Sequence, residues 1–118
     1  MSECSCRCYL AIDTARDIWE EARNAERAWK EGDQEGVRSG LEAIWSACET
    51  LYAIRPGMLG ALQRLAALID RASTAIYKPD DLVDRNEEPA EVASDALTLM
   101  LDVAEKEIYL PVKADCSR

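Results

Sequence analysis

The sequence predicts an all-α protein that folds as one antiparallel four-helix bundle. Apolar residues recur at steps of three and four in four successive segments, and no segment has the period-two alternation typical of a half-buried strand. Two of the three connections are short, which favours antiparallel neighbours. A chain of 118 residues is typical of a single domain. About two thirds of the unfolded surface can be buried at this size, so a core can form without metals or disulfides.

The first helix is expected over residues 10–31. Its apolar side chains lie along one face, and Gly32 fits the glycine that commonly follows a helix C-terminus. Residues 1–9 hold three of the five cysteines and are expected to form a flexible N-terminal segment. The apolar seam of this helix consists of Ala11, Ala15, Ile18, Ala22, Ala25 and Trp29.

The second helix is expected over residues 33–54. Asp33 is a favourable N-cap. Pro56 ends the helix, because the residue before a proline avoids the helical region. Gly36 and Gly40 weaken the first turns by about 1 kcal/mol each relative to alanine. Their small size would let a neighbouring helix approach closely.

The third helix is expected over residues 56–78 and the fourth over residues 89–109. Each begins with a proline, whose missing N–H is tolerated at the first helical position. The third helix is the most apolar of the four, which indicates a central position or a contact between subunits. A homodimer is therefore one expectation. Residues 79–88 form an acidic loop between these helices, and residues 111–118 form a C-terminal tail.

The charge of the chain is strongly acidic and unevenly distributed. Its 14 basic and 23 acidic residues give a net charge of −9. Residues 55–78 carry four basic residues and one acidic residue, a net of +3, whereas residues 79–110 carry two basic and ten acidic residues, a net of −8. Direct binding to nucleic acid is disfavoured, because it depends on cationic side chains that displace counterions from phosphates. An acidic segment is instead attracted to cationic surfaces.

The chain has no sequence feature of a membrane or secreted protein. No run of about 18 apolar residues predicts a transmembrane span, and the N-terminus lacks the basic and apolar regions of a signal peptide. An odd number of cysteines, five, fits a reducing compartment better than a secreted disulfide scaffold. We therefore expect a cytoplasmic protein that does not bind membranes.

Five carboxylates lie along one face of the fourth helix, opposite its apolar rows, and no basic residue interrupts them before Lys106. The row would be roughly 25 Å long, with neighbours about 5–6 Å apart, a spacing similar to that of phosphates along a DNA strand. The helix dipole favours anions only in the first turns. The row is therefore interpreted as a solubilising surface, as a docking face for a cationic partner or as a metal site. Its members are Glu88, Glu91, Asp95, Asp102 and Glu105, with Thr98 in the remaining place.

The acidic loop would enlarge this anionic surface if it folds beside the row. The partner would then be a basic protein or a nucleic-acid-binding complex, with the carboxylates in the site meant for phosphates. Charge complementarity of this kind steers and orients an encounter more than it sets affinity. The loop carboxylates belong to Asp80, Asp81, Asp84 and Glu87.

The cysteines near the ends of the chain are the next candidate site. In an extended segment Cys4, Cys6 and Cys8 would point the same way, and thiolates favour soft or borderline metal ions. A closed zinc site needs four ligands, and the chain has no histidine. Cys116 could be the fourth ligand only where both chain ends meet, as they do in an antiparallel four-helix bundle. Inert thiols, a metal site and a redox or inter-subunit disulfide are the three interpretations.

Aromatic bulk comes from tryptophan and tyrosine, because phenylalanine is absent. Trp19, Trp29 and Trp45 are expected mostly in the core. A tryptophan left exposed would instead be a natural interface anchor, because this residue is enriched among those that dominate binding energy.

Most enzyme classes are disfavoured, because histidine, the commonest general base, is missing and no phosphate-binding glycine loop or nucleophile elbow is present. Small helical nucleotide pyrophosphohydrolases tolerate these absences, since they hold Mg²⁺ with Glu-x-x-Glu and Glu-x-x-Asp pairs on consecutive helices. Here the pairs Glu88/Glu91 and Asp102/Glu105 share one helix, so the pattern departs from theirs. Glu20 and Glu21 would be additional ligands only by a coincidence of folding.

The expected function is that of a small, acidic, non-catalytic protein that inhibits or regulates a cationic partner and needs no cofactor. In size, charge and helicity the chain is similar to small acidic inhibitor proteins such as bacteriocin immunity proteins and phage-encoded antagonists of host enzymes. That similarity is one of composition. The alternatives are a helical bundle whose homodimerisation is its role, and a Mg²⁺-dependent carboxylate enzyme.

Overall fold

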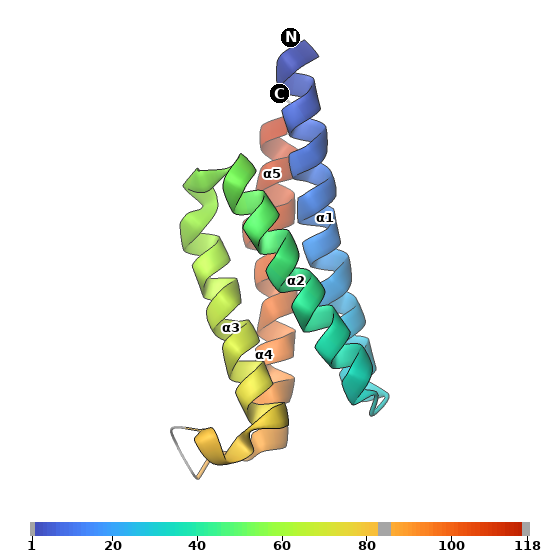
Figure 1. Cartoon of the computed structure of the whole chain (residues 1–118), viewed down its shortest axis with the longest axis vertical. Helices are drawn as coiled ribbons and strands as arrows, with labels where there is room; N and C mark the ends of the chain where they lie inside the picture. The colour runs from blue at the N-terminus through green and yellow to red at the C-terminus, as the bar shows by residue number, and fades with distance from the viewer. Residues whose placement is uncertain (1, 83–85, 117–118) are drawn as a thin grey trace.

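A computed structural model of the protein has the predicted all-α architecture, with four long helices in one bundle (Figure 1). It describes residues 2–82 and 86–116, and the side chains of residues 8–82 and 86–116. Across these ranges there is no β-strand, and no helix is long and apolar enough to cross a membrane. The helices are α1 (Ser2–Lys30), α2 (Gln34–Ile54), α3 (Leu59–Tyr77), α4 (Pro89–Val103) and α5 (Leu110–Cys116), with 3₁₀ turns at Pro56–Met58 and Pro79–Asp81 and a π-helical turn at Ala104–Tyr109.

The connection between α1 and α2 is a three-residue turn that local hydrogen bonds specify. Gly32 adopts a left-handed φ of 75° and donates its N–H to the carbonyl of Trp29 at 3.1 Å. The N–H of Asp33 reaches back to the carbonyl of Ala28 at 2.8 Å, which completes a Schellman C-cap. The Asp33 carboxylate then accepts the N–H of Gly36 at 3.0 Å and caps α2. One turn therefore ends the first helix and begins the second, as predicted.

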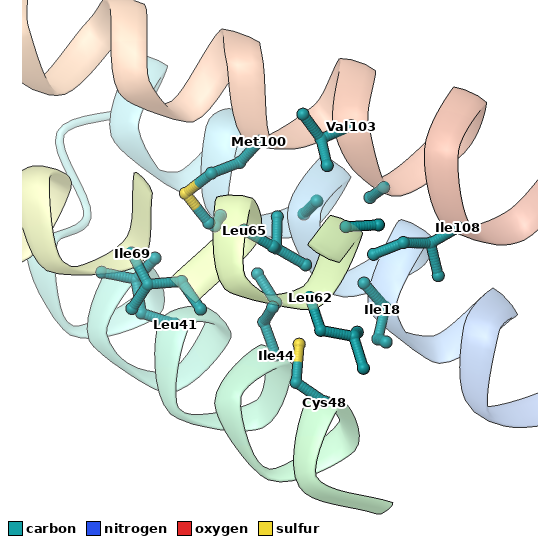
Figure 2. Packing of buried hydrophobic residues seen from close by; sticks show 14 of the residues in the cluster. Ile18, Leu41, Ile44, Cys48, Leu62, Leu65, Ile69, Met100, Val103 and Ile108 are labelled. Carbon is teal, nitrogen blue, oxygen red and sulfur yellow. The ribbon is translucent and has the colours of Figure 1, made fainter. Parts of the chain in front are cut away.

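The two halves of the bundle are helical hairpins. α2 packs along α1 and α3 packs along α4, whereas α2 and α3 approach each other at their connected ends and diverge from there (Figure 1). Most residues of the predicted apolar seams form one buried cluster to which all four long helices contribute, and a second, smaller cluster contains Ala75, Leu82, Val92 and Ala93. Figure 2 shows Leu62, Leu65 and Ile69 of α3 among buried side chains of the other helices.

The close approach of α1 and α2 depends on small residues, as the glycines in the second segment predicted. A Cβ added to Gly40 would lie 3.0 Å from the Cβ of Ala25, and one added to Gly36 would lie 2.9 Å from the Cβ of Ala28. Both distances are shorter than an ordinary van der Waals contact. The alanine seam of α1 therefore packs directly against the backbone of α2.

The N-terminal segment differs from the prediction, because α1 begins at Ser2 and residues 2–9 continue the helix that was expected over residues 10–31. No glycine or proline interrupts the chain before Gly32, so nothing in the local sequence ends the helix at Leu10. Tertiary contacts support it as well, since α1 packs against α5. The expectation of a flexible segment at residues 1–9 overlooked this continuation.

The C-terminal tail also differs, because the chain remains helical beyond Tyr109 through Cys116. Pro111 was expected to end the fourth helix at residue 109, since proline removes a hydrogen-bond donor and clashes with the preceding turn. The π-helical turn just before it accommodates this residue by a wider winding, in which the N–H of Leu110 reaches the carbonyl of Glu105. Burial of Ile108 and Val112 against the core favours the continuation.

Candidate functional site

The carboxylate row of α4 is the first candidate site. Glu88, Glu91, Asp95 and Asp102 are exposed, and Glu105 is half-buried. Residues on the opposite rows of the helix are buried, so the row projects away from the core. Thr98, the uncharged member of the row, donates its hydroxyl to the Glu26 carboxylate of α1 at 3.2 Å. The row therefore runs beside α1.

Neutralisation along this face is uneven, which corrects the expectation of an uninterrupted anionic row. Asp102 forms an ion pair with Lys106 at 2.9 Å. Within the described ranges, no basic side chain lies at ion-pair distance from Glu88, Glu91 or Asp95. No described basic side chain lies at ion-pair distance from Glu105 either, so three of the four uncompensated carboxylates of the row lie at the start of α4 and one lies beyond its end.

The basic residues of α3 contact acidic residues outside the row. Arg71 pairs with Glu87 at 2.9 Å, so this loop carboxylate is compensated. The guanidinium of Arg64 contacts Glu107. Both arginines of α3 are thus paired on the α3 side of α4, with carboxylates that do not belong to the row.

The loop between α3 and α4 adds carboxylates at the same end of the bundle. Asp80 and Asp81 are exposed on the 3₁₀ turn after α3, and Asp84 lies outside the described residues. Leu82 is buried with Val92 and Ala93, which fixes this turn to the start of α4. We call the following residues the acidic end: Asp80, Asp81, Glu88, Glu91 and Asp95.

Aromatic and basic side chains dominate the other end of the α1–α4 face. Trp19 stacks on Tyr109 with ring centroids 5.0 Å apart and an interplanar angle of 9°. The guanidinium of Arg23 lies 5.2 Å from the Trp19 ring, and the ammonium of Lys113 lies 5.8 Å from the Tyr109 ring. A hydrogen bond with Tyr109 raises the pKa of the Arg16 guanidinium. Cations therefore flank the stacked rings at this end of the face, where Arg16 also pairs with Asp13 at 3.2 Å.

An apolar groove between α2 and α3 is the second candidate site, and it contains a tryptophan that was expected in the core. Trp45, Tyr52 and Leu59 are 49%, 46% and 42% exposed. They border a hollow of about 170 Å³ whose other walls are almost entirely apolar. Trp45 lies one position beyond the buried Ile44, so the periodicity of α2 placed it on the edge of the apolar face. The hollow is completed by Cys48, Glu49, Leu62, Gln63 and Ala66.

The terminal thiols are the third candidate site, and the structure changes the way they come together. The side chains of Cys4, Cys6 and Cys8 were expected to converge if the chain there were extended. The backbone of this segment is helical instead. The side chains of Cys4 and Cys6 lie outside the described residues. Cys116 does meet Cys8, since its Sγ lies 3.8 Å from the Cys8 carbonyl oxygen. In the described part of the chain, no cluster of three or more Cys, Asp or Glu side chains could hold a metal ion.

The partly buried thiols of Cys8 and Cys116 both contact the guanidinium of Arg55. Nη2 of Arg55 lies 3.2 Å from the Cys116 Sγ and 3.6 Å from the Cys8 Sγ, while Nη1 pairs with Asp115 at 2.6 Å. Burial, together with a hydrogen bond to Cys8, raises the pKa of the Cys116 thiol to about 11.

A magnesium-dependent enzyme of the kind considered above would need carboxylates that face one another from two helices. The glutamates that suggested such an enzyme do not form this arrangement. Glu88 and Glu91 project outward from α4. Glu20 and Glu21 line a separate hollow between α1 and α2.

Comparison of the chain with known protein families, with curated proteins and with solved structures finds no match. The functional argument therefore starts from the geometry of these three sites.

Proposed function

We propose that this protein is a non-catalytic binding protein whose acidic end docks on a cationic protein surface. A nucleic-acid-binding protein is the natural partner, because its phosphate-binding site would accept the carboxylates. The observation that carries the proposal is the arrangement of Glu88, Glu91 and Asp95. They are exposed on consecutive turns, and no described basic side chain lies at ion-pair distance from them.

The physical basis is electrostatic steering by local charge rather than by the net charge alone. Charges separated by more than a Debye length, about 8 Å at physiological ionic strength, are largely screened. The acidic end therefore acts on a partner surface only at close range, and binding should weaken as salt is added. Nucleic acid should compete with it for the same cationic surface.

Reversing two charges at the acidic end tests the proposal. The variant Glu91→Lys with Asp95→Lys is expected to weaken partner binding by roughly tenfold or more, because like charges would meet across the interface. A tagged protein incubated with lysate of its source cells at low salt, then eluted with single-stranded DNA, measures what is bound. Circular dichroism checks that both lysines leave the helices intact.

The matched control is Asp17→Lys with Glu20→Lys on α1. It changes the net charge by the same four units at two exposed positions that line the hollow between α1 and α2. This control should retain partner binding. Equal loss in both variants would mean that net charge alone drives the association, and undiminished binding of the α4 variant would contradict the proposal outright.

Self-association through the apolar groove is the second candidate function, and the exposure of Trp45 favours it. A half-exposed tryptophan beside Tyr52 and Leu59 is the kind of apolar patch that marks protein interfaces. A second copy whose groove faces the first would cover all three side chains in both protomers by two-fold symmetry.

Substitution of Trp45 by alanine is expected to weaken such a dimer by roughly 30-fold or more, because truncation of one anchoring tryptophan commonly costs about 2 kcal/mol and each protomer contributes one. Sedimentation equilibrium at micromolar concentrations measures the dissociation constant. Leu99→Ala is the control, since Leu99 is equally exposed but does not line the groove. A parent protein that sediments as a monomer at these concentrations would remove this candidate.

A further inference from the structure

The fold brings the two ends of the chain, which carry thiols, together at one end of the bundle. Cys8 lies near the start of α1 and Cys116 at the end of α5, and these helix ends lie side by side (Figure 1). Arg55, from the connection between α2 and α3, reaches across to both sulfurs, as its 3.2 Å and 3.6 Å contacts show. Residues from three distant parts of the sequence therefore form one cluster, which the proposed docking function does not use.

We propose that Cys8 and Cys116 form a reversible intramolecular disulfide by exchange with a low-molecular-weight disulfide of the glutathione class. The bond would fasten the C-terminal helix to the N-terminal helix. The two sulfurs can be no farther apart than the sum of their distances to the shared nitrogen, so rotation about the cysteine side chains and a small shift of the helix ends bring them together. A disulfide needs Cβ atoms about 3.5–4.5 Å apart.

The exchange proceeds in two balanced steps. The Cys8 thiolate attacks one sulfur of the glutathione disulfide, which forms a mixed disulfide on Cys8 and releases one glutathione thiolate. Cys116 then loses its proton to solvent and attacks the Cys8 sulfur, which releases the second glutathione thiolate. Both protein thiols are oxidised, and the glutathione disulfide is reduced to two thiols.

The environment assigns an order to these steps. The raised pKa of Cys116 keeps it protonated at neutral pH, so it acts second. The positive charge of Arg55 beside the Cys116 Sγ acts in the opposite direction on the pKa of Cys116, but the effect of burial is larger. Cys48 takes no part, because burial raises its pKa to about 12 and it lies in the core beneath the apolar groove. It is therefore an internal control for selectivity.

The test measures the exchange equilibrium in folded and unfolded protein. A Cys4→Ser, Cys6→Ser variant, which keeps Cys8, Cys48 and Cys116, is equilibrated with glutathione buffers of varied ratio in native solution and in urea. We expect a mass loss of two hydrogens and a linked pair of tryptic peptides containing Cys8 and Cys116. The equilibrium constant should be at least about tenfold higher in native solution, because the fold holds the thiols together.

Further measurements separate a specific bond from random oxidation. The oxidised variant should unfold at a temperature about 10 °C or more above the reduced one, because the bond closes a long loop. Adding Cys116→Ser should leave glutathione attached to Cys8, and Arg55→Gln should slow the exchange several-fold. An equilibrium constant no higher than in urea, or linkage only between molecules or to Cys48, would overturn the proposal.

Repeating the measurement on the parent chain asks whether Cys4 or Cys6 competes for Cys116. The Cys8–Cys116 linkage should predominate there as well, and predominance of another pairing would count against the proposal. The Asp115 ion pair gives a further check, since Asp115→Asn should loosen Arg55 and reduce the native preference.

Discussion

Replacing Leu65 with alanine is expected to lower the free energy of unfolding by about 4 kcal/mol, because it removes a fully buried side chain and leaves a cavity. Leu65 is 0% exposed and belongs to the cluster that joins all four long helices. Figure 2 shows it among buried side chains of α1, α2 and α4 that belong to the same cluster. Urea denaturation followed by circular dichroism measures the change. A domain of this size is stable by about 5–15 kcal/mol, so the loss would be a large part of the total.

Leu99→Ala is the matched control for Leu65→Ala. The same atoms are removed from a leucine that is 51% exposed on α4, so the expected loss is below about 1 kcal/mol. Losses of similar size in the two variants would mean that Leu65 is not at the centre of the core. A changed slope of the denaturation curve would instead indicate a change in compactness.

The helical periodicity predicted most of this core from the sequence. The seam from Ala11 to Ala25 is buried along its full length, as are Val37, Leu41, Ile44 and Leu51 on the second helix. Local chemistry also predicted the first turn, because a glycine in the left-handed region followed by a capping aspartate allows few other conformations. Where a conformation depends only on residues that are close together in the chain, it can be predicted from the sequence.

The expectations that were wrong depended on contacts that are distant in the sequence. Residues 1–9 were expected to form a flexible segment, whereas residues 2–9 are the first turns of α1, and Cys8 there meets Cys116 of α5. Pro111 was expected to stop the fourth helix, but a π-helical turn lets it continue to Val112, which packs in the core. Periodicity also could not locate Trp45, because a residue at the edge of an apolar face is covered only if a neighbouring helix comes close.

The charge pattern could be predicted in sign but not in distribution. Counting residues indicated an acidic fourth segment and a basic third one. The structure pairs Arg71 with Glu87 on one side of the fourth helix and Asp102 with Lys106 along it. Three-dimensional pairing therefore decides which carboxylates of the fourth segment remain uncompensated, and Glu88, Glu91 and Asp95 at the acidic end are among them.

The acidic end and the apolar groove belong to different faces of the bundle. The carboxylate row runs beside α1, to which Thr98 is hydrogen-bonded, whereas the groove lies between α2 and α3. One flat partner surface would not cover both. Charge reversal on α4 and truncation of Trp45 therefore test separate interactions, and a protein that docks and self-associates would lose each property independently.

Replacing Gly40 with valine is expected to lower the free energy of unfolding by about 3 kcal/mol, because α2 packs so closely on α1 at this position that there is no room for a side chain. A Cβ at this position would already lie 3.0 Å from the Cβ of Ala25 and 3.4 Å from the carbonyl oxygen of Glu21. Two further methyl groups would force the hairpin apart, and overpacking of this kind commonly costs about 1–3 kcal/mol or more. Thermal and urea unfolding give the change.

Ser39→Val separates this crowding from helix propensity. It places the same β-branched side chain one residue earlier on α2, at an exposed position, where propensity alone should change stability by less than about 0.5 kcal/mol. Gly40→Val should also weaken the packing of α1 on α2 without touching the acidic end. If Gly40→Val proves as stable as Ser39→Val, the two helices can separate at little cost and their close contact does not hold the first hairpin together. A large difference would identify the alanine and glycine seam as the contact on which the α1–α2 hairpin depends.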